Sequence, residues 1–277
     1  MSSQTPASEA RRAEIVADLR RRLARMEGLA SDGADCLSFG LPALDDHLPQ
    51  GGLACGAVHE IAPADDADLP AAFGFLIALL GRLPGRTPLL LVLSSRKLTR
   101  CGAPHGNGLA GFGLDPSRLI LVETANEAEA LWATEEAVRA RGPAAVAAAL
   151  DGQLDLKASQ RLLHAARDAR LPLLLLRPGG KSVVTATTRW RIGAAPGRRD
   201  RFGMLAGWRW HVALERCRNG RTEEWEVEFD HATHRFGLAE RLAGASLARC
   251  GAAEATDCGA AGDKSCGAAG ATGRGAA

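Results

Sequence analysis

Several features that define common protein classes are missing from this 277-residue sequence. No apolar run approaches the roughly 18 to 20 residues of a membrane-spanning helix, and residues 1–14 contain no apolar core of a secretory signal. The histidines form neither an HExxH pattern nor the spacing of a nucleophile–histidine–acid triad. We therefore expect a cytoplasmic protein that does not bind a membrane, and the sequence indicates no catalytic residues.

Paired cysteines are missing as well. The seven cysteines form no C-x-x-C pair, so we expect reduced thiols and no metal site. Cys250, Cys258 and Cys266 each begin a Cys-Gly-Ala-Ala unit in a segment rich in alanine and glycine. Such a composition buries too little apolar surface to offset the entropy of the chain. We predict that residues 244–277 are a disordered tail.

The middle of the chain alternates between predicted strands and predicted helices. Strands are predicted at 57–61, 88–95, 119–123, 144–150 and 171–176, and helices at 71–82, 126–142 and 155–170. Apolar strands that alternate with helices are typical of a parallel sheet covered on both faces. We therefore predict an α/β domain over residues 31–243, with a mainly parallel central sheet flanked by helices.

The pattern changes after residue 177. The runs 187–192, 208–217 and 223–229 alternate between polar and apolar residues, and Asn219-Gly220 lies between the last two. This dipeptide favours a hairpin with a type I′ turn, because both residues tolerate positive φ. We predict an antiparallel C-terminal extension of the sheet.

The N-terminal segment 1–30 contains a predicted basic amphipathic helix over residues 8–30. Leu19, Leu23 and Met26 belong to its apolar stripe, and arginines cover the remaining surface. Such a helix packs on its own domain or docks on another protein chain, and contact with nucleic acid is a third alternative.

One loop has the outline of a nucleotide site without its chemistry. A Gly-Gly turn and the strand 57–61 lead to the place where a phosphate loop, GxxxxGK[ST], needs a lysine and a hydroxyl. The residues of this degenerate loop are Pro63, Asp65, Asp66, Asp68, Leu69 and Pro70. The prolines lack N–H donors, and a carboxylate at about 5 Å from a phosphate charge costs roughly 3 kcal/mol at an effective dielectric of about 20. We predict that the loop does not bind ATP.

Two further motifs are incomplete. Gly180-Lys181-Ser182 follows the strand 171–176 too closely to wrap a phosphate, and the residues after it are β-branched, so we interpret it as a basic loop. Residues 153–157 resemble the QL[SD]LF peptide that binds bacterial sliding clamps, but the final aromatic residue is absent. Asp155 is alternatively the N-cap of the helix that begins there.

Longer segments carry a family resemblance. The string LSFGLPALDDHLPQGGLACGAVHEI resembles the opening of RecA-family ATPases. The blocks GLDPSRLILVE, LDLKASQRLLHAA, TATTRWRI and WRWHVALERCRNGRTEEWEVEFD together resemble the ImuA family, over roughly residues 10 to 240. That family keeps a RecA-like core and has lost the phosphate loop. Many relatives carry a tyrosine where His105 stands, whereas this chain contains no tyrosine, and the cysteine-containing tail lies outside the pattern.

The resemblance implies a non-catalytic accessory role in SOS-induced, error-prone translesion DNA synthesis. The implied partners are ImuB, which is an inactive Y-family polymerase relative, and an error-prone C-family polymerase. RecA and non-specific DNA are further candidate partners, and no cofactor is expected. Two alternatives stay open: a RecA-like ATPase with an irregular phosphate site at Lys181, and a SulA-type cell-division inhibitor that binds FtsZ.

Charge patterning indicates where a partner would bind. Residues 177–222 contain eleven Lys or Arg and two acids, whereas residues 223–230 contain five acids. Arginine-rich loops neutralise phosphates without reading sequence, and Trp190, Trp208 and Trp210 either stack on bases or pack beneath the strands. The predicted DNA- or partner-binding residues are Arg177, Lys181, Arg189, Arg191, Arg198, Arg199 and Arg201. The alternative is a plain solvated face, because residues 193–203 have the composition of a mobile loop.

Overall fold

The computed structural model describes residues 36–94, 102–151, 153–178 and 182–239. The predicted N-terminal helix, the predicted tail and Lys181 lie outside these residues. A nine-stranded sheet organises the described part of the chain, in the order β11-β10-β9-β8-β3-β7-β6-β4-β5. Its strands are β3 (Val58–Pro63), β4 (Leu89–Ser94), β5 (Leu119–Thr124), β6 (Ala145–Ala149), β7 (Leu173–Leu176), β8 (Thr188–Arg199), β9 (Leu205–Cys217), β10 (Glu223–Asp230) and β11 (Arg235–Leu238).

Helices and short elements complete this architecture. Strands β1 (Cys36–Leu37) and β2 (Leu53–Ala54) form a small antiparallel pair of their own. The helical elements are α2 (Pro42–Asp45), η1 (Asp66–Asp68), α3 (Leu69–Gly81), α4 (Gly106–Gly111), η3 (Pro116–Arg118), α5 (Glu127–Arg139) and α6 (Leu156–Ala169). None of these described helices is both long and apolar enough to cross a bilayer.

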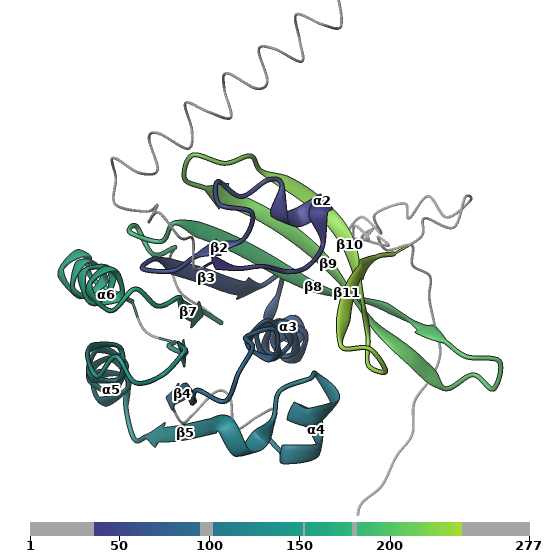
Figure 1. The fold of residues 1–277 in the computed structure, drawn as a ribbon, viewed down its shortest axis with the longest axis horizontal. Coiled ribbons are helices and arrows are strands. Elements are labelled where there is room, and N and C mark those ends of the chain that lie inside the picture. Colours follow the sequence, from purple (N-terminus) through teal and green to yellow (C-terminus); the bar gives the residue numbers. More distant parts are fainter. Residues whose placement is uncertain (1–35, 95–101, 152, 179–181, 240–277) are drawn as a thin grey trace, which may run out of the picture. The chain divides into compact units, whose positions relative to one another are not determined.

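The sheet is parallel from β8 to β5 and antiparallel from β8 to β11. Figure 1 shows α5 and α6 side by side on one face of the parallel part, with α3 on the opposite face. Strand β7 is buried along its whole length, and its alternate residues contribute to the two apolar clusters on the two faces. The predicted fold class, a RecA-like α/β core with an antiparallel C-terminal extension, is confirmed.

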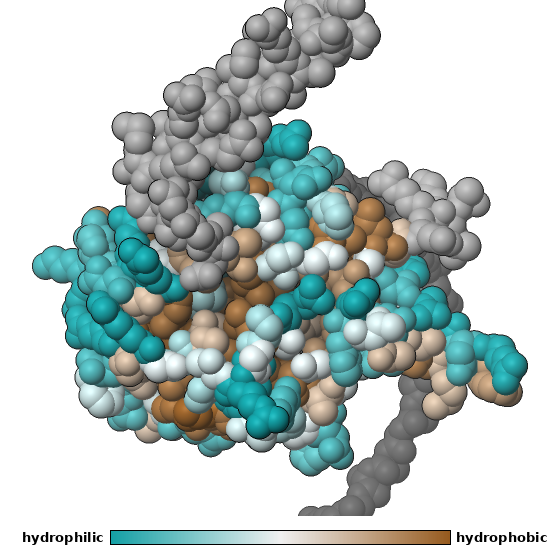
Figure 2. Space-filling model, in the orientation of Figure 1, coloured by the Kyte–Doolittle hydropathy of each residue, from teal (hydrophilic) through white to brown (hydrophobic). Residues whose placement is uncertain are grey.

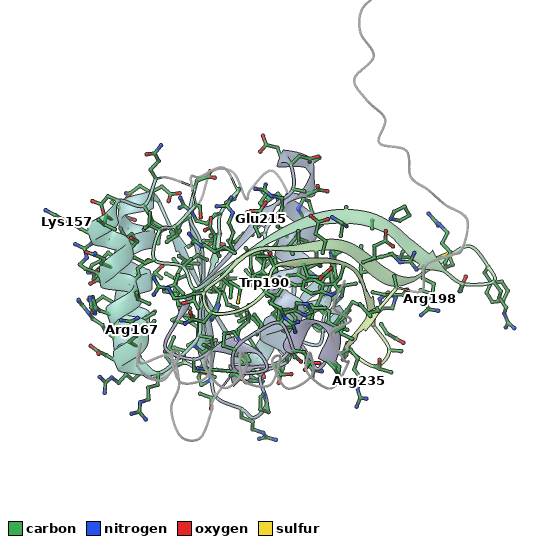
Figure 3. The ribbon with its side chains drawn as sticks, turned by 90° about the horizontal axis from the view of Figure 1, so that it is seen from above. Lys157, Arg167, Trp190, Arg198, Glu215 and Arg235 are labelled. Atoms are coloured by element: carbon green, nitrogen blue, oxygen red, sulfur yellow. The ribbon has the colours of Figure 1, made fainter. Side chains whose placement is uncertain are left out.

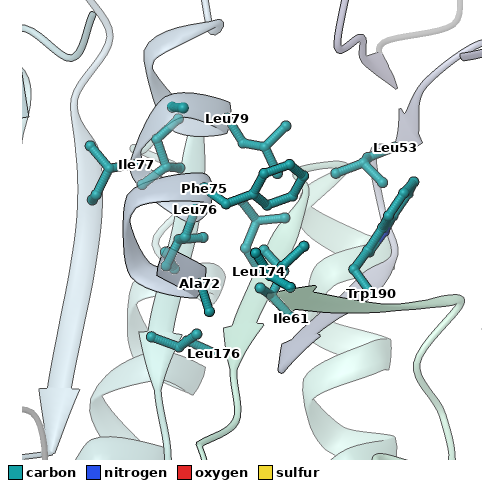
Figure 4. Close-up of a cluster of buried hydrophobic side chains, with 14 of the residues drawn as sticks. Leu53, Ile61, Ala72, Phe75, Leu76, Ile77, Leu79, Leu174, Leu176 and Trp190 are labelled. Atoms are coloured by element: carbon teal, nitrogen blue, oxygen red, sulfur yellow. The ribbon is translucent and has the colours of Figure 1, made fainter. Parts of the chain in front are cut away.

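The larger apolar cluster joins α3 to the antiparallel extension. Phe75 of α3 packs near Trp210 of β9 with ring centroids 5.6 Å apart, and Trp190 of β8 is fully buried. Figure 4 shows side chains of α3 facing Ile61 of β3 and Leu174 of β7. The extension is therefore part of the same hydrophobic core as the parallel sheet.

The antiparallel strands differ from expectation in two places. Residues 193–199, which resembled a mobile loop, continue β8 and pair with β9. The hairpin between β9 and β10 is present, but the type I′ turn is wrong, because only Asn219 of the Asn-Gly pair has positive φ. Gly220 is required for space instead, since a Cβ there would lie 2.6 Å from the carbonyl oxygen of His47.

Candidate nucleotide loop and interaction surface

The degenerate loop after β3 fills its own anion position. In a phosphate loop, the backbone N–H groups that open the helix point at the phosphate. Here, Asp65 Oδ1 accepts hydrogen bonds from the backbone N–H groups of Ala67, at 2.8 Å, and Asp68, at 3.2 Å. A carboxylate of the chain therefore binds the donors that a phosphate would need.

The other residues of this loop also have structural roles. Asp68 Oδ1 accepts a hydrogen bond from the backbone N–H of Ala194 at 2.9 Å, which fixes the start of α3 against β8. Pro63 ends the buried strand β3, Leu69 is buried, and Pro70 opens α3 without an N–H group. Asp66 is exposed beside them. The acidic loop is thus a helix start tied to the neighbouring strand.

Arg177 lies at the end of β7, and its side chain is buried. Its guanidinium group donates a hydrogen bond to the carbonyl oxygen of Leu150 at 3.1 Å. Burial lowers the pKa of Arg177, and the nearby carboxylates of Glu60, Glu127 and Asp151 oppose that shift. Arg177 is therefore not part of the exposed surface.

Three of the predicted arginines form ion pairs across the strands. Arg189 contacts Glu60 at 3.1 Å and Glu215 at 2.7 Å, and Arg191 also pairs with Glu215. Burial opposes ionisation of Glu215, but the hydrogen bonds from Arg191 and Arg189 outweigh it and lower the pKa of this carboxyl group. In Figure 3, Glu215 lies far from Arg198, near the end of β9.

Arg198 is paired in the same way nearer the tip of the β8–β9 hairpin. It donates a hydrogen bond to Glu228 of β10, which Arg209 contacts from β9 at 3.0 Å. These bonds outweigh partial burial and lower the pKa of Glu228. Glu228 of β10 therefore pairs with two arginines of the basic stretch that precedes it in the sequence. Arg199 and Arg201 lie farther out, at the exposed end of the hairpin.

The tryptophans divide between packing and exposure. Trp190 and Trp210 are buried, as the packing interpretation predicted, whereas Trp208 is 42% exposed. Trp208 lies 5.7 Å from the ring of Phe112, next to α4, so one side of its indole packs against the core domain. Phe202 and Met204 at the hairpin tip are more exposed still. Sequence reasoning missed these two residues, because two apolar residues among arginines show no helical or strand periodicity that would predict an exposed surface.

These features define a RecA-like α/β protein in which Asp65 caps the turn after β3 and a two-stranded hairpin extends the sheet. No family model matches the chain. It is 37% identical over 237 residues to Protein ImuA of two Caulobacter vibrioides strains, NA1000 / CB15N and ATCC 19089 / CIP 103742 / CB 15, and the match covers 79% of this chain and 93% of each relative. The chain belongs to the ImuA family.

Proposed function

We propose that this chain is a non-catalytic accessory protein of SOS-induced, error-prone translesion DNA synthesis. It acts in the cytoplasm as an adaptor for ImuB and an error-prone C-family polymerase, with RecA and DNA as further partners. Membership of the ImuA family supports the role in damage-inducible mutagenesis. The observation that carries the non-catalytic part is the pair of hydrogen bonds from Ala67 and Asp68 to the Asp65 carboxylate.

Electrostatics supports a pseudo-ATPase. A triphosphate in the loop between β3 and α3 would have to displace the Asp65 carboxylate from the N–H groups of η1 and lie beside Asp66 and Asp68. Like charges at this separation cost roughly 3 kcal/mol each at an effective dielectric of about 20. The loop has no lysine to offset that repulsion. The fold is therefore available for binding macromolecules rather than for hydrolysis.

The remaining basic surface is smaller than the sequence predicted. Since Arg177 is buried and three other arginines are paired with acids, the proposed contact surface consists of Arg199 and Arg201, with Arg198 at its base. Lys181 stays a sequence-based prediction. A surface of this kind contributes salt-sensitive affinity.

Induced mutagenesis in cells tests the proposed function. In a bacterium that carries the ImuB cassette but lacks its own copy of this gene, we expect the wild-type chain and Lys181→Ala to restore ultraviolet-induced mutation frequency equally. A wild-type chain that restores nothing would contradict the accessory role. Restoration by the wild type but not by Lys181→Ala would instead favour an irregular phosphate site.

A further inference from the structure

The β8–β9 hairpin ends in an exposed apolar cluster. Phe202 is 73% exposed and Met204 is 66% exposed, and Leu205 and Trp208 follow them at 39% and 42%. The hairpin projects beyond the other strands of the sheet in Figure 1, and residues of high and low hydropathy lie close together along this projection in Figure 2. Apolar side chains gathered at one projecting end mark an interaction site rather than ordinary surface.

Hydrogen bonds hold the tip in one conformation. Asp200 Oδ1 accepts from the backbone N–H groups of Phe202, at 2.8 Å, and Met204, at 2.9 Å. The backbone N–H of Asp200 donates to the carbonyl oxygen of Met204 at 2.8 Å, and Gly203 has the left-handed φ of 78° that this turn needs. The turn thus presents both apolar side chains before any partner binds, which lowers the entropy cost of association.

The charges around the tip favour a protein over a nucleic acid. Arg198 is paired with Glu228, and Arg199 donates to the carbonyl oxygen of Gly203 at 2.7 Å. Arg201 lies over the ring of Phe202, with its guanidinium carbon 4.6 Å from the ring centroid. All three of these cations thus make contacts within the chain, and the Asp200 carboxylate in the turn would repel phosphates.

The composition of the tip is that of a protein interface. Phe, Met, Trp and Arg are enriched in the cores of such interfaces, and a few aromatic anchors carry most of the binding energy. The ring of Trp208 packs near Phe112, which supports the base of the hairpin against the core domain. A projecting hairpin with exposed apolar side chains and arginines beside them complements an apolar pocket with an acidic rim.

We propose that Phe202 and Met204 insert into an apolar, acid-rimmed pocket of a partner protein, with Arg201 facing the rim. This inference rests on the proposed adaptor function and names the chemistry of the partner surface. It makes the affinity depend mainly on apolar burial, with a smaller salt-sensitive contribution from Arg201.

Binding measurements with purified components test this inference. The full chain and the double variant Phe202→Ser/Met204→Ser are titrated with ImuB and RecA from the same bacterium, with a single-stranded oligonucleotide and with phosphatidylglycerol-containing vesicles. We expect the double variant to bind ImuB or RecA at least about 30-fold more weakly, the loss typical of removing central anchors. Arg201→Glu should weaken the same complex about threefold to tenfold. The control Leu156→Ser removes an apolar side chain of comparable exposure on α6 and should bind as the wild type does.

The outcomes separate this inference from the proposed function. If the wild type binds ImuB or RecA and the double variant binds equally tightly, the docking inference is wrong and the adaptor function stands. Loss of oligonucleotide or vesicle binding alone would also overturn the inference, since it would assign the tip to nucleic acid or lipid. A wild-type chain that binds neither protein would contradict the adaptor function and this inference together. Unchanged thermal unfolding of the double variant excludes misfolding as the cause of a lost interaction.

Discussion

A chain of hydrogen bonds through His59 connects the small β1–β2 pair to the main sheet. The carbonyl oxygen of Ala54 can only accept, so His59 Nε2 donates to it at 2.9 Å, and Nδ1 accepts from the Thr188 hydroxyl at 2.8 Å. Trp190 Nε1 in turn donates to that hydroxyl oxygen at 2.9 Å. The arrangement requires a neutral imidazole, which makes His59 a structural residue rather than a catalytic one.

The buried histidine predicts how stability depends on pH. Burial lowers the pKa of His59 from 6.5 to about 4, while the bond to Ala54 partly opposes this. Because the unfolded chain takes up the proton first, stability is lost as the pH falls from about 6.5 toward 4. We expect about 2 kcal/mol of unfolding free energy to be lost between about pH 7 and about pH 5. Urea unfolding at the two pH values measures this loss, and His59→Gln should be less sensitive by that amount. Equal pH dependence in the two proteins would contradict a neutral buried His59.

Paired and exposed arginines should respond differently to truncation. Glu60 is fully buried, so Arg189→Ala removes the ion-pair partner of a buried carboxylate and should lower the unfolding free energy by about 3 kcal/mol. Arg201→Ala at the hairpin tip should leave stability unchanged, because its side chain is exposed. Denaturant unfolding measures the free energy of unfolding of both variants. Equal losses would contradict the distinction between the paired Arg189 and the exposed Arg201.

At the scale of elements, the hydrophobic period predicted most strands and helices. β3, β4, β5, β6, β7, α3, α5 and α6 all fall on predicted runs, and Asp155 caps α6 by accepting from the N–H of Ala158 at 2.6 Å. The period says nothing about turns of a few residues, so α4 and β11 were missed. It also failed at residues 193–199, where glycine and proline indicated a loop although cross-strand pairing makes them a strand.

The β9–β10 turn offers a test of local packing. An alanine at Gly220 would place its Cβ 2.6 Å from the His47 carbonyl oxygen and 2.2 Å from Cys217 Sγ. Gly220→Ala should therefore lower the unfolding free energy by about 1 to 3 kcal/mol, as overpacking does. Gly237→Ala in β11 is the control, because an added Cβ there meets no atom within 4 Å. Thermal unfolding measures the stability of both variants. A Gly220→Ala protein as stable as the Gly237→Ala protein would show that the turn has room for the added Cβ.

At the scale of the whole molecule, strand pairing decides which charges remain available. The sequence separates a basic stretch from an acidic one, but antiparallel pairing brings Glu228 beside Arg198 and Arg209. Residues 19 or more positions apart in the sequence therefore form ion pairs, as Arg209 and Glu228 do. The absence of a lysine from the loop after β3 could be read from the sequence, whereas the loss of nucleotide binding stays a prediction. Which arginines remain on the exposed contact surface could not be predicted from the sequence, because it depends on the register of the strands in the sheet.

The central claim is that this RecA-like core no longer binds nucleotide, and calorimetric titration of the purified chain with ATP and Mg²⁺ tests it most directly. Because the Asp65 carboxylate already accepts from the N–H groups of Ala67 and Asp68 in the turn just before α3, we predict no heat of binding even at millimolar nucleotide. Lys181→Ala, titrated in parallel, should give the same flat trace. Saturable binding by the wild type would contradict the account, and its loss in Lys181→Ala would place the nucleotide at the second Gly-Lys-Ser sequence.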